Sequence, residues 1–74
     1  MMNEELTALF EEIFGHPGNS FSDDEKFDHL QKAAYELGDG VILGQLRRIK
    51  DSGKIELSEE TSKDFEDSLS FVGS

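Results

Sequence analysis

Acidic side chains are the residues of this sequence whose number and spacing could do chemistry. The 74-residue chain has 17 Asp and Glu against 7 Lys and Arg, which gives a formal net charge of −10. Carboxylates at this density attract basic macromolecules and repel free nucleic acid and anionic membrane surfaces. We therefore predict a basic partner protein. The predicted contact residues are three adjacent acidic pairs early in the chain: Glu4, Glu5, Glu11, Glu12, Asp23 and Asp24.

Catalytic and cofactor chemistry needs side chains that this sequence does not supply. His16 and His29 are the only histidines and there is no cysteine, so zinc would lack nitrogen and sulfur ligands. No Ser, His and Asp set forms a nucleophile motif. The glycines within 38–44 do not make a phosphate-binding loop, because that loop follows a strand and here a helical pattern precedes it. We expect no enzyme activity, no cofactor and no bound metal.

The segment 48–59 resembles the calcium-binding loop of EF-hand proteins. Gly53 holds its sixth position, Ile55 its eighth and Glu59 its twelfth. Phe21 and Glu25 are four residues apart, as Ile55 and Glu59 are. The resemblance implies two helix-loop-helix units. Three ligand positions, however, hold residues without a carboxylate: Arg48, Lys50 and Ser52. Two cations there would repel calcium, so the implied units are metal-free.

Residues 33–57 resemble the paired helices of winged-helix DNA-binding domains. The resemblance rests on AAYELG at 33–38 and on QLRRIKDSGKIEL at 45–57. It implies that the second helix lies in the DNA major groove. The implied nucleic-acid contacts are Gln45, Arg47, Arg48 and Lys50. The turn is shorter than in that family, an acidic helix replaces the wing, and the net charge opposes binding to phosphates. A DNA-binding regulator is therefore the alternative to a protein-binding module.

The first half of the chain carries apolar residues at helical spacing. A helix is predicted from Glu4 to Phe14, capped by Asn3 and ended by Gly15. Its apolar stripe is Leu6, Leu9, Phe10, Ile13 and Phe14. A second helix begins after Ser22, which has capping-box spacing to Glu25, and ends at Gly38. Its predicted inward residues are Phe27, Leu30, Ala34 and Leu37, with Ala33 beside them.

The second half predicts two further helices. Asp39 caps the third, with Ile42, Leu46 and Ile49 at helical spacing and Leu43 alongside. A short strand at 41–43 is the alternative, because glycines weaken this helix. Residues 54–57 alternate polar with apolar and are expected to be extended. Ser58 begins the last helix, whose apolar positions are Phe65, Leu69 and Val72.

These patterns predict one acidic domain over residues 1–74, an all-α compact bundle of four short helices. The longest aliphatic run, 41–43, is too short to span a membrane, and the first residues lack signal-peptide features, so a cytoplasmic protein is expected. We interpret it as an inhibitor, immunity-type or adaptor protein of phage or bacterial type that docks on a basic surface, with mimicry of DNA phosphates as one mechanism. The other alternative is a structural homodimer, with exposed apolar residues near Phe71 and Val72 as its contact.

Overall fold

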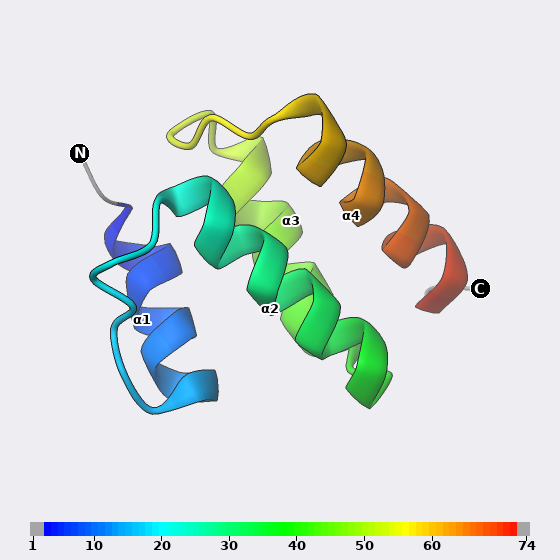
Figure 1. Ribbon diagram of the computed structural model, residues 1–74. Helices are drawn as coiled ribbons and strands as arrows, with labels where there is room; N and C mark the ends of the chain where they lie inside the picture. Colours follow the sequence, from blue (N-terminus) through cyan, green and yellow to red (C-terminus); the bar gives the residue numbers. More distant parts are fainter. Residues whose placement is uncertain (1–2, 73–74) are drawn as a thin grey trace.

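Residues 3–72 of the protein form an all-α bundle of four helices. The computed structural model describes the backbone of residues 3–72 and the side chains of residues 3–70. The helices are α1 (Glu4–Phe14), α2 (Asp23–Leu37), α3 (Gly40–Asp51) and α4 (Glu59–Val72), and no strand occurs within residues 3–72 (Figure 1). The four predicted helices are thus confirmed. The alternative strand at 41–43 is wrong, because these residues lie in the first turn of α3.

Local capping interactions explain where the first three helices begin. The Asn3 side chain accepts a hydrogen bond from the backbone N–H of Leu6. Ser22 and Glu25 form both hydrogen bonds of the predicted capping box at the start of α2. Asp39 accepts from the first backbone N–H groups of α3. Each cap satisfies donors that the first helical turn leaves unpaired, so the sequence signals and the observed helix starts agree.

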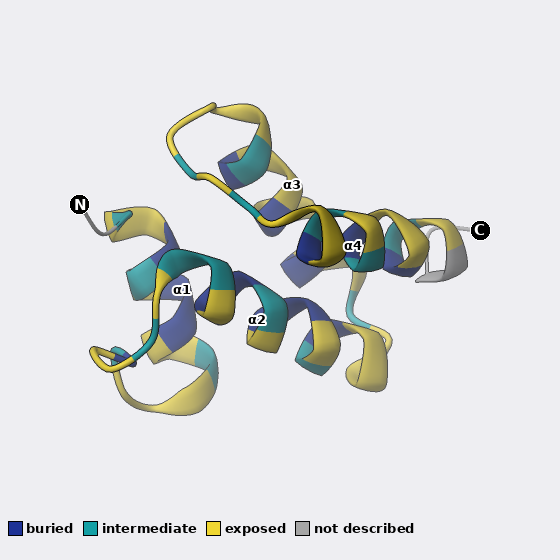
Figure 2. Cartoon of the chain, turned by 45° about the horizontal axis from the view of Figure 1, so that its top comes forward, coloured by how far each residue is buried: buried dark blue, intermediate teal, exposed yellow. Residues whose placement is uncertain are grey.

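Helix α2 is the central element of the bundle, since it contacts all three other helices. The buried faces of the helices point toward a common interior (Figure 2). The buried core consists of Leu6, Leu9, Phe10, Phe27, Leu30, Ala34, Ile42, Leu43, Leu46, Ile49 and Phe65. At its α2–α4 side the rings of Phe27 and Phe65 meet edge to face, with centroids 4.9 Å apart. Burial of these apolar groups is the main favourable contribution to folding.

An aromatic cluster joins α1 to the loop that leads to α2. The Phe10 ring lies 4.6 Å from that of Phe14 and 5.9 Å from that of Phe21, measured between centroids. Gly18 packs directly against it: a Cβ atom there would come within 2.6 Å of the Phe10 ring, and φ is +63°. Only glycine combines this backbone angle with this close approach. The loop between α1 and α2 is therefore held by side-chain packing.

Two predictions about apolar residues need comment. Leu37 was predicted to point inward, and this is wrong, because the residue is 70% exposed. Its spacing from Leu30 is helical, but Leu37 is the last residue of α2, where the described part of the bundle leaves most of its surface open. The predicted apolar contact at Phe71 and Val72 lies outside the residues whose side chains the structure describes.

Candidate functional site

The four glutamates of α1 form two pairs on different sides of the helix. All four residues are exposed. Residues seven apart lie two turns apart on one side, so Glu5 aligns with Glu12 and Glu4 aligns with Glu11, about 100° away. Only the first pair lines the space between α1 and α3. The sequence grouped these residues as one acidic set, whereas the structure divides them between two surfaces.

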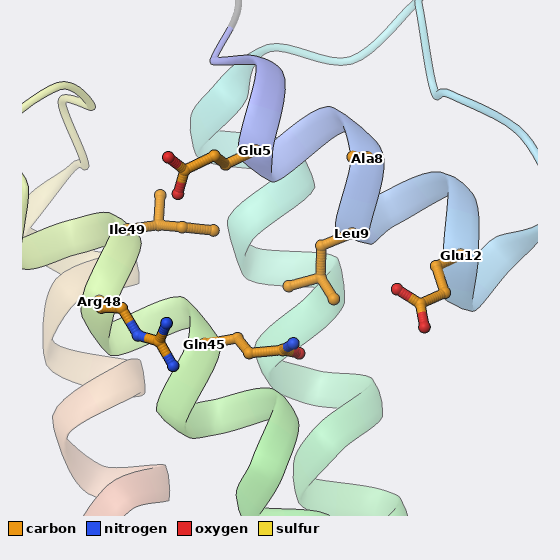
Figure 3. Close-up of a pocket in the computed structure, with 7 residues that line it drawn as sticks. All are labelled: Glu5, Ala8, Leu9, Glu12, Gln45, Arg48 and Ile49. Atoms are coloured by element: carbon orange, nitrogen blue, oxygen red, sulfur yellow. The ribbon is translucent and has the colours of Figure 1, made fainter.

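A shallow groove of about 280 Å³ separates α1 from α3 (Figure 3). The residues lining this α1–α3 groove are Glu5, Ala8, Leu9, Glu12, Gln45, Arg48 and Ile49. Leu9 and Ile49 are core residues that lie at its bottom, with 6% and 4% of their surfaces exposed. Its floor is therefore apolar, and carboxylates stand on its α1 wall.

The α3 wall of the groove holds two residues of the alternative nucleic-acid set. Gln45 and Arg48 are exposed on α3 and border the same space as Glu5 and Glu12. In Figure 3 the Gln45 side chain points across the groove toward α1, and the Glu12 carboxylate points back toward α3. The groove thus contains members of both predicted contact sets. Its charge is unequal, with two carboxylates facing one guanidinium.

The other members of the basic set are engaged elsewhere. Lys50 donates a 3.0 Å hydrogen bond to Glu66 on α4, and its ammonium group lies 5.7 Å from the centre of the Phe65 ring. Arg47 pairs with Asp51 at 3.7 Å on the exposed surface of α3. Lys50 therefore joins α3 to α4, which is a structural contact. Only Gln45 and Arg48 of this set line the groove.

Asp23 and Asp24 hold helix ends together, which the sequence did not indicate. Asp23 accepts a 3.0 Å hydrogen bond from the backbone N–H of Asn3. Asp24 accepts from the backbone N–H of Ser58 at 2.8 Å and from the hydroxyl of Thr61 at 3.2 Å. Both aspartates are half-buried. They connect the start of α2 to the starts of α1 and α4, so their carboxylates serve the fold and are poor candidates for a partner contact.

A polar network between α2 and α4 also escaped the sequence analysis. The Ser68 hydroxyl donates to the Gln31 side-chain carbonyl at 2.7 Å, and the Gln31 amide donates to Asp28 at 3.1 Å. Lys32 completes it with a 2.9 Å ion pair to Asp28. Burial raises the pKa of Asp28, but the hydrogen bonds from Lys32 and Gln31 outweigh burial and hold that pKa below its usual 3.8. Gln31 and Ser68 are buried, and no local pattern marks such a pair 37 residues apart.

Two larger hollows are less suited to recognition. One of about 470 Å³ lies between α2 and α4, and another of about 700 Å³ lies beside the loop before α4. The first borders the Gln31–Ser68 hydrogen bond, and the second includes Asp23 and Asp24. Four of the polar residues at these places, Gln31, Ser68, Asp23 and Asp24, are therefore already used within the fold. The α1–α3 groove differs in having two residues of the buried core, Leu9 and Ile49, in its lining beneath the glutamates.

The segment that resembles an EF-hand loop has a different course here. Residues 48–51 still belong to α3, so the first four positions of that frame are helical. Within the described part of the chain, no three His, Asp or Glu side chains come together as metal ligands. The segment therefore connects α3 to α4, and its first four positions continue the preceding helix.

Comparisons of this chain with protein-family models, with curated proteins and with solved structures returned no match. Among residues 3–72, no helix combines the length and the apolar character needed to cross a membrane.

Proposed function

We propose that this protein is an acidic binding module that docks a basic surface of a partner protein into its α1–α3 groove. The observation that carries the proposal is the pairing of Glu5 with Glu12 along one wall above an apolar floor. Such charges increase the rate of association with a basic partner and orient it, while the apolar floor contributes contact area. The groove holds carboxylates, an amide and a guanidinium, which suits recognition rather than catalysis.

An inhibitor, immunity-type protein or adaptor would all use a surface of this kind. In the DNA-mimic version of the proposal, the exposed carboxylates of α1 take the place of phosphates in a nucleic-acid channel of the partner. We propose the cytoplasm of a bacterial or phage-infected cell as the setting. Imaging of a fluorescent fusion tests the location, and a nuclease or polymerase assay with the captured partner tests the inhibition.

Two charge-matched variants test the docking face. Glu5→Gln/Glu12→Gln and Glu4→Gln/Glu11→Gln remove the same charge from the same helix, on different sides. Affinity capture from the source cells with the native protein as bait should enrich a basic protein. The first variant should lose most of that protein at low salt, whereas the second should retain it. Raising the salt concentration should reduce the difference, because exposed charges are screened.

Binding of duplex DNA, with an increase in affinity when Glu5 and Glu12 are neutralised, would favour the DNA-binding alternative. A nucleic-acid reader should bind duplex DNA more tightly when the Glu5–Glu12 pair is neutralised, since repulsion from phosphates falls. It should lose DNA binding when Arg47 and Arg48 are changed to Gln. For the docking proposal we expect no mobility shift of duplex DNA with either variant. An equal capture of the basic protein by both Glu variants would contradict the docking proposal.

A further inference from the structure

The α1–α3 groove is uncovered, unlike the corresponding groove on the other side of α3. Helix α4 contacts both α2 and α3 and so covers the space between them. Helix α2 contacts both α1 and α3 and so backs the groove from the core side, and within residues 3–72 α4 makes no contact with α1. The Glu5–Glu12 pair extends over two helical turns, about 10 Å. The groove thus has the length of a short helical segment.

Two exposed aliphatic side chains lie where α2 passes into α3, and one of them is on the groove side of α3. Leu37 and Val41 are 70% and 72% exposed, the highest values among the large hydrophobic residues described. Val41 precedes Gln45 by one helical turn, so it lies on the groove side of α3. Leu37 follows Leu30 by two turns on the same side of α2 and is the last residue of that helix. Adjacent exposed aliphatics beside a groove are typical of a protein contact surface.

We propose that the α1–α3 groove binds an amphipathic helix of the partner protein. Its apolar side chains contact Leu9, Val41 and Leu37, and Lys or Arg residues along one flank face Glu5 and Glu12. Its other flank, neutral or acidic, faces Arg48. This inference rests on the proposed docking function and specifies what the groove receives. Helix-in-groove recognition uses residues at helical spacing in this way.

The charge and area of the surface favour this occupant over a second copy of the chain. A copy with net charge −10 brings mainly acidic surface toward Glu5 and Glu12. A stable dimer buries about 800 Å² on each partner, and two aliphatic side chains supply only a fraction of that area. A basic amphipathic helix brings both the opposite charge and further apolar contacts.

A synthetic peptide provides a defined probe. The peptide carries a leucine stripe at helical spacing, two Lys residues spaced as Glu5 and Glu12 are, and Glu on the opposite flank. The control peptide has the same composition in scrambled order. With 15N-labelled full-length protein, the stripe peptide should shift the amide signals of Leu9, Val41 and Gln45 in a saturable manner. The scrambled peptide should bind at least about tenfold more weakly.

Protein variants assign the binding to the groove. Glu5→Gln/Glu12→Gln should weaken the stripe peptide about three- to tenfold at low salt, and Glu4→Gln/Glu11→Gln should leave its affinity nearly unchanged. Leu37→Gln/Val41→Gln should weaken it about tenfold or more. All these residues are exposed, and unchanged melting curves confirm that each variant is folded.

Several results would overturn the helix proposal. These are equal affinity for the scrambled peptide, signal shifts confined to α2 and α4, or normal binding by Leu37→Gln/Val41→Gln. Sedimentation that shows a native dimer lost in the Leu37→Gln/Val41→Gln variant would assign the surface to a second copy instead. If a basic protein is captured through Glu5 and Glu12 but the stripe peptide does not bind, the helix proposal fails while the docking function stands. If no basic protein is captured through Glu5 and Glu12 and the stripe peptide does not bind, the helix proposal and the docking function both fail.

Discussion

The Asp24 carboxylate accepts a hydrogen bond from the backbone N–H of Ser58, 34 residues later in the sequence, at 2.8 Å. It also accepts a hydrogen bond from the Thr61 hydroxyl at 3.2 Å. A residue in the first turn of α2 therefore satisfies donors at the beginning of α4. Because α4 has a thin apolar stripe, this contact helps to determine where the helix begins and how it docks against α2.

Replacing Asp24 with Ala should destabilise the protein by about 1–2 kcal/mol, since it leaves the Ser58 N–H and the Thr61 hydroxyl without that acceptor. Urea denaturation followed by circular dichroism measures the loss. Asp67→Ala is the matched control, because Asp67 is an exposed acid of α4. The control should be neutral or slightly stabilising, given the higher helix propensity of Ala. Equal losses in both variants would show that Asp24 acts only through general charge.

Replacing Phe10 with Ala should cost about 3–5 kcal/mol, as expected for a large aromatic side chain in a core. Phe10 is only 2% exposed and anchors the cluster with Phe14 and Phe21. A domain of this size holds about 3–5 kcal/mol in total, so much of the population should be unfolded at room temperature. Phe14→Ala, at a residue that is 39% exposed, should cost clearly less. A native-like melting curve for Phe10→Ala would show that α1 does not pack as described.

Replacing Gly18 with Ala and replacing Gly44 with Ala should change the stability of the protein in opposite directions. Gly18→Ala should destabilise the protein by at least about 1 kcal/mol, because φ is +63° and the new Cβ would meet the Phe10 ring. Gly44 lies within α3, where an added Cβ has open space around it. Gly44→Ala should therefore stabilise the protein by about 0.5–1 kcal/mol through helix propensity. Thermal melting of both variants tests the pair, and a shift of the same sign in both would contradict the geometry.

The sequence predicted the local features of this fold well and the non-local ones poorly. Helix boundaries followed from caps such as Asn3 and Ser22, which act within a few residues of their partners. The exposure of Leu37 could not be foreseen, because it depends on which elements pack around the end of α2. The division of the α1 glutamates follows from helical spacing alone, but which pair faces α3 needed the packing. The role of Asp24 and the Gln31–Ser68 bond join distant parts of the chain, and no sequence pattern marks them.

The ion pair of Asp28 with Lys32 should make stability depend on pH in the acidic range. Burial raises the pKa of Asp28, but the hydrogen bonds donated by Lys32 and Gln31 lower it by more. The pKa of Asp28 therefore lies below the usual 3.8 in the folded protein. A carboxyl with a lowered folded-state pKa contributes stability above its unfolded pKa, and this contribution is lost as pH falls through the folded value. The free energy of unfolding of the native protein should therefore exceed that of Asp28→Asn near pH 6, and the difference should shrink below about pH 4.

Denaturant titrations of both proteins from pH 6 down to pH 2 measure this difference. Asp51→Asn is the matched control, since Asp51 pairs with Arg47 at the same helical spacing but at 3.7 Å, with both side chains more than two-thirds exposed. Its effect should be small across the whole range, because exposed pairs of this kind contribute little. If Asp28→Asn differed from the native protein by a constant amount at every pH, titration of Asp28 would not be the cause. The network with Gln31 and Ser68 would then stabilise α4 through hydrogen bonding alone, independent of the charge on Asp28.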